Sequence, residues 1–111
     1  MKISFQDYET LSVLTLSGEF THDDVNALTR VTGEREKAGA RHIVLDCTNL
    51  EFIDSAALES LLRLQERLGL AGGQLRLIKP EETIATILRL TRIDLALESH
   101  ESLELAVRSL R

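Results

Sequence analysis

Asp54 and Ser55 are the adjacent residues of this chain whose types most clearly suggest a chemical role. The apolar residues that follow them recur at helical spacing: Ala57, Leu61, Leu64 and Leu68. Ser55 is therefore expected in the first turn of a helix, where unpaired N–H donors and the helix dipole favour an anion. A phosphate on this serine would add about −1.5 to −2 charges, and the protein could carry it with little refolding.

Phosphate at this position is expected to release a bound partner rather than recruit one. A partner surface over the helix start would meet a hydrated dianion beside Asp54 and Glu59, where desolvation and like-charge repulsion are both unfavourable. The residues alone leave a second interpretation open. Asp54 or Ser55 could serve only as the N-cap of the helix, because both residue types are preferred there.

The outward face of the same helix is predicted to carry small and charged side chains: Ala56, Glu59, Ser60 and Arg63. Such a mixed surface suits a polar and reversible protein contact. An ordinary solvated helix face is the alternative, above all for Arg63.

Catalysis and metal binding have little support in the residue pattern. Ser55 and Asp54 could be combined with a histidine into a triad, but no nucleophile elbow or other catalytic signature accompanies them. The histidines are scattered, at His22, His42 and His100. No metal, cofactor or enzymatic activity is expected, and Cys47 is interpreted as a small core residue.

Composition narrows the class of protein further. The chain has 111 residues, 43% of them hydrophobic, which predicts one domain over residues 1–111 with a real core. The net charge of −5 without a basic cluster argues against direct binding to nucleic acid. No apolar run approaches the roughly 20 residues of a membrane span. A single cysteine and a polar amino-terminal stretch predict a cytoplasmic location.

The amino-terminal half predicts a hairpin, a helix and a buried strand. Residues 3–16 alternate as two strands around a turn at 7–10, and Gly18 is expected to close the hairpin. Thr21 and Asp24 have the spacing of a capping box, which starts a helix that ends at Gly39. Residues 42–46 predict a central strand, followed by a loop over 47–53.

The carboxyl-terminal part predicts shorter elements. Residues 74–78 are expected to form a strand, Pro80 to open a helix, and residues 95–97 to form a last strand. Ser99 is the expected cap of a final helix with Arg108 and Arg111 near its end, and Leu103, Ala106, Val107 and Leu110 on its inward face. Strands alternating with helices indicate an α/β fold, with a mixed sheet of four to five strands covered by about four helices.

Residues 45–68, LDCTNLEFIDSAALESLLRLQERL, resemble the STAS domain family and, within it, the anti-sigma-factor antagonists. The hallmark of these proteins is an apolar strand, a loop and a D-S-x-G-L sequence opening a helix, which here spans Asp54 to Leu58. The segment from Ser17 to Phe20 looks like the family's G-E-L-D turn, and the likeness covers nearly the whole chain. Ala57 and Thr21 depart from the glycine and aspartate usual at these positions.

The resemblance implies a partner switch. The unmodified protein would bind an anti-sigma serine kinase, free a sigma factor and so regulate transcription indirectly, and phosphorylation of Ser55 would end that binding. The implied partner-binding residues are Gly18, Glu19, Thr21, Asp54, Ser55, Ala56, Ala57, Glu59, Ser60 and Arg63. The alternative is an unphosphorylated STAS scaffold subunit of a lipid-transporting ABC complex or a signalling assembly. A monomer is expected in either case.

Overall fold

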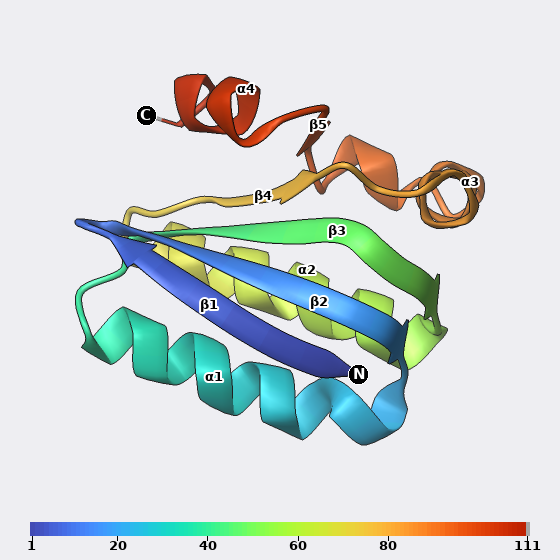
Figure 1. Ribbon diagram of the computed structural model, residues 1–111, viewed down its shortest axis with the longest axis horizontal. Coiled ribbons are helices and arrows are strands. Elements are labelled where there is room, and N and C mark those ends of the chain that lie inside the picture. The colour runs from blue at the N-terminus through green and yellow to red at the C-terminus, as the bar shows by residue number, and fades with distance from the viewer. Residues whose placement is uncertain (111) are drawn as a thin grey trace.

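The computed structural model describes residues 1–110 and contains one five-stranded mixed sheet with helices on both faces (Figure 1). The strands are β1 (Lys2–Tyr8), β2 (Leu11–Phe20), β3 (His42–Ile53), β4 (Leu75–Ile78) and β5 (Ser99–His100). The helices are α1 (Val25–Lys37), α2 (Ser55–Leu70), α3 (Glu82–Leu90) and α4 (Leu103–Arg108). Two 3₁₀ turns, η1 (His22–Asp24) and η2 (Ile93–Leu95), complete the fold. The predicted α/β class is confirmed.

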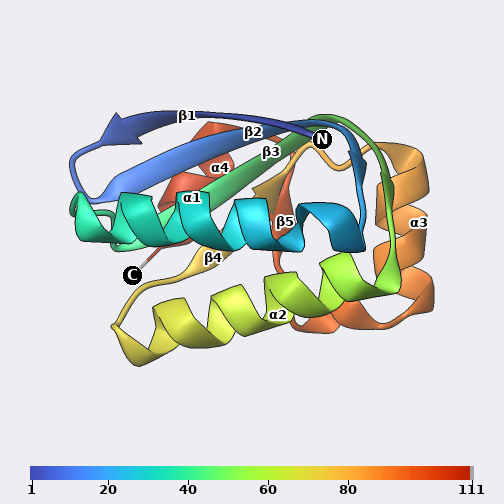
Figure 2. The same ribbon diagram turned by 90° about the horizontal axis from the view of Figure 1, so that it is seen from below.

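The strands lie in chain order across the sheet. β1 and β2 form an antiparallel hairpin, whereas β2, β3, β4 and β5 run parallel to one another. Each parallel step needs a crossover, which α1, α2 and α3 provide. Figure 2 shows α1 and α2 side by side beneath one face of the sheet, so the carboxyl ends of β2 and β3 both open toward helix starts.

β2 and β3 are longer than the sequence pattern predicted. Gly18 does not close the hairpin, because β2 continues to Phe20, and the loop predicted over 47–53 is the second half of β3. Parallel pairing of Ser17 with Asn49 through to Phe20 with Ile53 holds both segments extended. Gly18 has a φ of +93° at a register shift in this pairing, a conformation that L side chains rarely adopt.

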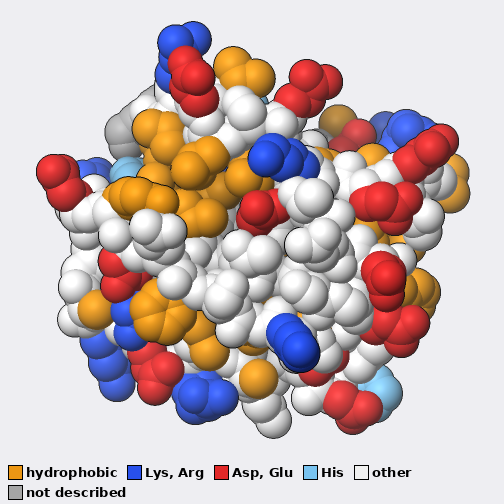
Figure 3. Space-filling view, viewed as in Figure 1, with side chains coloured by type: hydrophobic (Ala, Val, Ile, Leu, Met, Phe, Trp, Pro, Cys, Tyr) orange, Lys and Arg blue, Asp and Glu red, His pale blue; other side chains and the backbone are white. Residues whose placement is uncertain are grey.

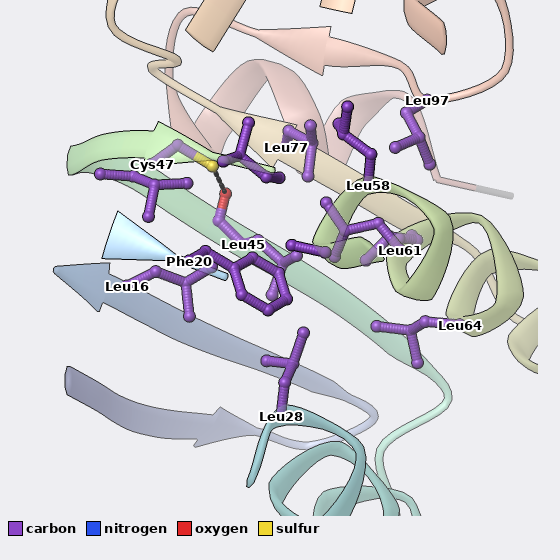
Figure 4. Close-up of a cluster of buried hydrophobic side chains, with 14 of the residues drawn as sticks. Leu16, Phe20, Leu28, Leu45, Cys47, Leu58, Leu61, Leu64, Leu77 and Leu97 are labelled. Carbon is purple, nitrogen blue, oxygen red and sulfur yellow. Dashed lines mark hydrogen bonds between the residues drawn. The ribbon is translucent and has the colours of Figure 1, made fainter. Parts of the chain in front are cut away.

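The core lies between the sheet and the pair α1 and α2 (Figure 4). Leu16 and Phe20 of β2 meet Leu61 of α2, and all three are at most 2% exposed. Cys47 of β3 belongs to the same cluster, as predicted, and burial raises the pKa of its thiol to about 12. This thiol is therefore a packing group rather than a nucleophile.

The opposite face of the sheet is covered by α4. Val44 and Ile78 are buried there against Ala106, while Arg76 donates to the hydroxyl of Ser109 at 2.9 Å. All four residues of β4 are buried because both faces of this strand are covered. The strand predicted over 74–78 is confirmed as β4.

Several carboxyl-terminal predictions need correction. The strand predicted at 95–97 falls on η2 and the residues after it, and the last strand is β5. The final helix is capped by Ser102, whose hydroxyl accepts the Leu105 N–H at 3.2 Å, and not by Ser99. Val107, expected to face inward, is 42% exposed. Arg111, expected beyond the end of this helix, lies outside the described residues.

Candidate functional site

Two helix starts lie next to each other at one edge of the sheet. Phe20, the last residue of β2, pairs with Ile53, the last residue of β3, and the Asp54 N–H donates to the Phe20 carbonyl at 3.1 Å. Because the two strands are parallel, the chain leaves both of them on the same side. Thr21 and Asp54, 33 positions apart in sequence by their numbers, therefore stand at one edge.

Asp54 is the N-cap of α2. One carboxylate oxygen accepts the Ala57 N–H at 2.8 Å, and the other accepts the His22 N–H at 2.9 Å. The hydrogen bond from Ala57 is the main cause that lowers the pKa of Asp54 below its ordinary value of 3.8. Asp54 is therefore ionised at neutral pH and ties the start of α2 to the start of η1.

Thr21 caps the neighbouring helical segment with the predicted capping box. Its hydroxyl accepts the Asp23 N–H at 3.4 Å, and Asp24 accepts the Thr21 N–H at 3.0 Å. That hydrogen bond from Thr21 is the main cause that lowers the pKa of Asp24. The role of Thr21 as a helix cap is confirmed, and its hydroxyl is engaged in the cap.

Ser55 is the first residue of α2 and is exposed. Since Asp54 provides the cap, the Ser55 hydroxyl is not needed for it. Glu59 and Arg63 are also exposed, on the same helix one and two turns further on, and their side chains lie 3.2 Å apart. Ala56 is half-buried.

Two of the predicted contact residues do not reach the surface. Ala57 is fully buried and Ser60 is 7% exposed, with its hydroxyl donating to the Ala57 carbonyl at 2.7 Å. The prediction that Ser60 points outward is wrong. α2 packs against both the sheet and α1, so its buried stripe also includes Ser60.

A family model described as the STAS domain matches residues 2–106. This chain belongs to the STAS domain family. The G-E-F and D-S-A-A-L segments of this STAS domain are the parts that meet at the edge formed by β2 and β3.

Solved structures that share the fold include those of three proteins. A candidate anti-sigma factor antagonist of Thermotoga maritima is 19% identical, with a TM-score of 0.86 over 96% of this chain and 92% of that one. An anti-sigma factor antagonist from Mycobacterium paratuberculosis is 23% identical, with a TM-score of 0.83 over 97% and 92%.

The third protein is the anti-sigma factor antagonist SpoIIAA in its unphosphorylated form, which is 18% identical, with a TM-score of 0.80 over 96% and 93%. Bacillus SpoIIAA in the phosphorylated form is 17% identical, with a TM-score of 0.72 over 96% and 97%. At these identities the comparison establishes the STAS fold.

His22 is a residue at this edge that the sequence pattern did not assign. Its Nδ1 lies 3.5 Å from the Asp54 carboxylate and its Nε2 lies 3.2 Å from Asp23. The sequence suggested His22 only as an imagined base for Ser55. No local pattern predicts its contact with Asp54, because parallel strand pairing creates it.

The surface at this edge is rich in acidic groups. Glu19, Asp23 and Glu51 are exposed and lie within three residues of Thr21 or Asp54 in the sequence. Figure 3 shows carboxylates along the side of the molecule where β2 and β3 end. Within residues 1–110, no three His, Cys, Asp or Glu side chains are placed to hold a metal ion. Nor does this part of the chain contain a helix long and apolar enough to cross a membrane.

Proposed function

We propose that this STAS domain is a cytoplasmic anti-sigma-factor antagonist whose binding to an anti-sigma serine kinase is controlled by phosphorylation of Ser55. The observation that carries the proposal is the division of labour at the start of α2. Asp54 caps the helix, and the adjacent serine is left exposed at a position where a hydroxyl has no structural task. A kinase can modify this hydroxyl without unwinding the helix.

The acidic edge provides the physical basis for the switch. The unmodified site already carries the Asp54 carboxylate, with exposed Glu59 on the same helix and exposed Asp23 beside His22, which contacts Asp54. A phosphate would add about two negative charges to this surface, and a docked partner would have to desolvate them. Phosphorylation is therefore expected to release the partner and let it bind its sigma factor.

The proposed contact surface consists of exposed and half-buried residues around this edge. It includes Gly18, Glu19 and Thr21 on one side and Ser55, Ala56, Glu59 and Arg63 on the other. Ala57 and Ser60 are assigned a supporting role, since both are buried. The existence of a phosphorylated form of SpoIIAA, which shares the fold, supports the same kind of control here. The proposed output is binding rather than turnover.

Intact-mass spectrometry with fragmentation tests the proposal on protein isolated from its native cells. A single phosphate on Ser55 that is absent from a chromosomal Ser55→Ala strain is the expected result. Ser99, which is also exposed, serves as an internal comparison for non-specific modification. Unmodified protein during both growth and stress, together with stable association with permease and ATPase subunits, would contradict the switch and favour a constitutive scaffold subunit.

A further inference from the structure

A groove with a volume of about 230 Å³ lies between α1 and α2. It is lined by Leu28, Thr29 and Thr32 of α1 and by Ser60, Arg63, Leu64 and Arg67 of α2. Leu28 and Leu64 are 2% and 3% exposed and form its apolar floor. The groove is thus a second candidate binding surface on α2, in addition to the helix start at Ser55.

Small hydroxyl side chains leave this space open. The hydroxyls of Thr29, Thr32 and Ser60 donate to carbonyls of their own helices, at 2.9, 2.9 and 2.7 Å. Their hydrogen-bonding capacity as donors is therefore used within the fold, and a ligand is not needed to satisfy it. The lining is polar and apolar in about equal measure, and its apolar part is the floor formed by Leu28 and Leu64.

The two arginines at the groove have different roles. Arg67 bridges the helices: it contacts both carboxylate oxygens of Glu36, the shorter contact being 2.7 Å, and donates to Thr32 at 3.0 Å. Arg63 has a single ion pair with Glu59 at 3.2 Å, in which both side chains are more than half exposed. Such exposed pairs contribute little stability, so Arg63 is the cation that can change partners.

The position and size of the groove indicate a protein occupant. Arg63 follows Ser55 by eight residues, which places it about 12 Å further along the same helix and within reach of a partner docked on the Ser55 edge. Small-molecule pockets usually measure about 300–1,000 Å³, so this groove is small for a free ligand. It has room for a side chain that a docked protein inserts.

We infer that the groove receives an apolar side chain of the switch partner, and that a neighbouring carboxylate of that partner binds Arg63. This inference rests on the proposed function and adds the chemistry of the partner segment. Arg63 would exchange its solvated pair with Glu59 for a carboxylate at a less hydrated interface, where an ion pair is stronger. Arg63 thus determines the orientation of the contact, and the leucine floor provides its apolar component.

The experiment first needs a defined probe. Ser55→Ala and Ser55→Asp proteins are used as baits in a native lysate, and the protein retained only by Ser55→Ala is produced in pure form. Its affinity is then measured for variants made in the Ser55→Ala background. Arg63→Glu is expected to weaken binding at least about 10-fold, because a close interfacial charge pair is replaced by repulsion.

Arg30→Glu is the matched control. Arg30 is 66% exposed, forms the same kind of ion pair one turn away with Glu34, and lies outside the groove. Arg30→Glu changes the net charge by the same amount as Arg63→Glu, and the affinity of this variant for the partner should stay within about 2-fold of the parent. Binding of the parent should also fall more steeply with salt than binding of Arg63→Glu.

A second pair of variants tests the apolar component. Thr29→Trp fills the groove from an exposed position and should weaken binding, whereas Asn26→Trp on the same helix and outside the groove should not. Circular dichroism confirms that each variant folds. Equal affinities of Arg63→Glu and Arg30→Glu, or of Thr29→Trp and Asn26→Trp, overturn this inference and leave the switch intact. If the lysate contains no protein that Ser55→Ala retains and Ser55→Asp does not, the proposed function itself is overturned.

Discussion

The starts of η1 and α2 are neighbours in space, and they use hydroxyl residues in opposite ways. At the first start the Thr21 hydroxyl is engaged in a capping box with Asp23 and Asp24. At the second start Asp54 caps the helix, and the Ser55 hydroxyl remains at the surface. In this protein, the hydroxyl that forms the cap is engaged in hydrogen bonds, and the hydroxyl next to an aspartate cap lies at the surface.

The largest expected effect is a change of charge at the open start. In the proposed switch, Ser55→Asp should weaken partner binding about 100-fold relative to Ser55→Ala, equivalent to about 2.8 kcal/mol. Isothermal titration with the captured partner measures it. Ser99→Asp places the same charge on an exposed serine of β5 and should leave the affinity unchanged. If both aspartates weaken binding alike, the effect comes from net charge and the comparison of the two starts fails.

Removal of each cap tests how strongly the two starts are held. Thr21→Ala should lower the free energy of unfolding by about 1 kcal/mol, the usual cost of a lost N-cap. Asp54→Ala should cost more, because the Ala57 and His22 N–H groups both lose their acceptor. Urea unfolding of the two variants ranks them. The opposite ranking would mean that the hydrogen bond from the His22 N–H to Asp54 contributes nothing to the free energy of unfolding.

A glycine at position 57 separates the structural from the binding role of the D-S-A-A-L segment. Ala57→Gly should destabilise the fold by about 1 kcal/mol, since glycine is unfavourable inside a helix. Partner affinity should stay the same, because the Ala57 methyl group is buried and faces the core. Combined unfolding and binding measurements test this prediction. A gain in affinity would show that the partner approaches the backbone at this position.

The smallest expected effect is the acid dependence of the two caps. The pKa values of Asp24 and Asp54 are lowered in the folded protein, so their stabilising contribution is full above the ordinary value of 3.8 and is lost as pH falls through the folded values. Asp54→Asn should therefore lose less stability than the parent between about pH 5 and pH 2. Urea midpoints across this range provide the measurement.

His42 provides an internal reference for that titration. Burial lowers its pKa below 6.5, so the folded state resists protonation of this imidazole and stability declines as pH falls below that value. The parent and Asp54→Asn share this decline. A difference between the two proteins that appears already above about pH 5 would therefore not belong to the Asp54 carboxylate.

Local patterns predicted the elements that their own residues determine. The helical repeat after Ser55 became α2, the Thr21 and Asp24 spacing became a capping box, and residues 43–45 became part of a strand buried on both faces. Each signal lies within a few residues, and backbone geometry converts it directly into structure. The Asp-Ser pair at a helix start, the central part of the candidate site, was predictable for the same reason.

Predictions failed where distant segments pair. Gly18 and the stretch 47–53 have the composition of turns, but pairing between β2 and β3 keeps both extended. Ser60 looked like a surface residue until α1 packed beside α2. The short elements after β4 were misplaced because β5 has only two residues, too few for any periodic signal.

The sequence by itself determined the α/β class, the capped helix starts and the candidate serine, because these depend on residue type and spacing over one or two turns. Only the tertiary structure decided that the two starts meet, that Asp54 rather than Ser55 is the cap, and that His22 lies against Asp54. It also decided that a groove opens beside Arg63. These features arise from parallel strand pairing and helix packing between residues about 30 positions apart, which no local pattern encodes.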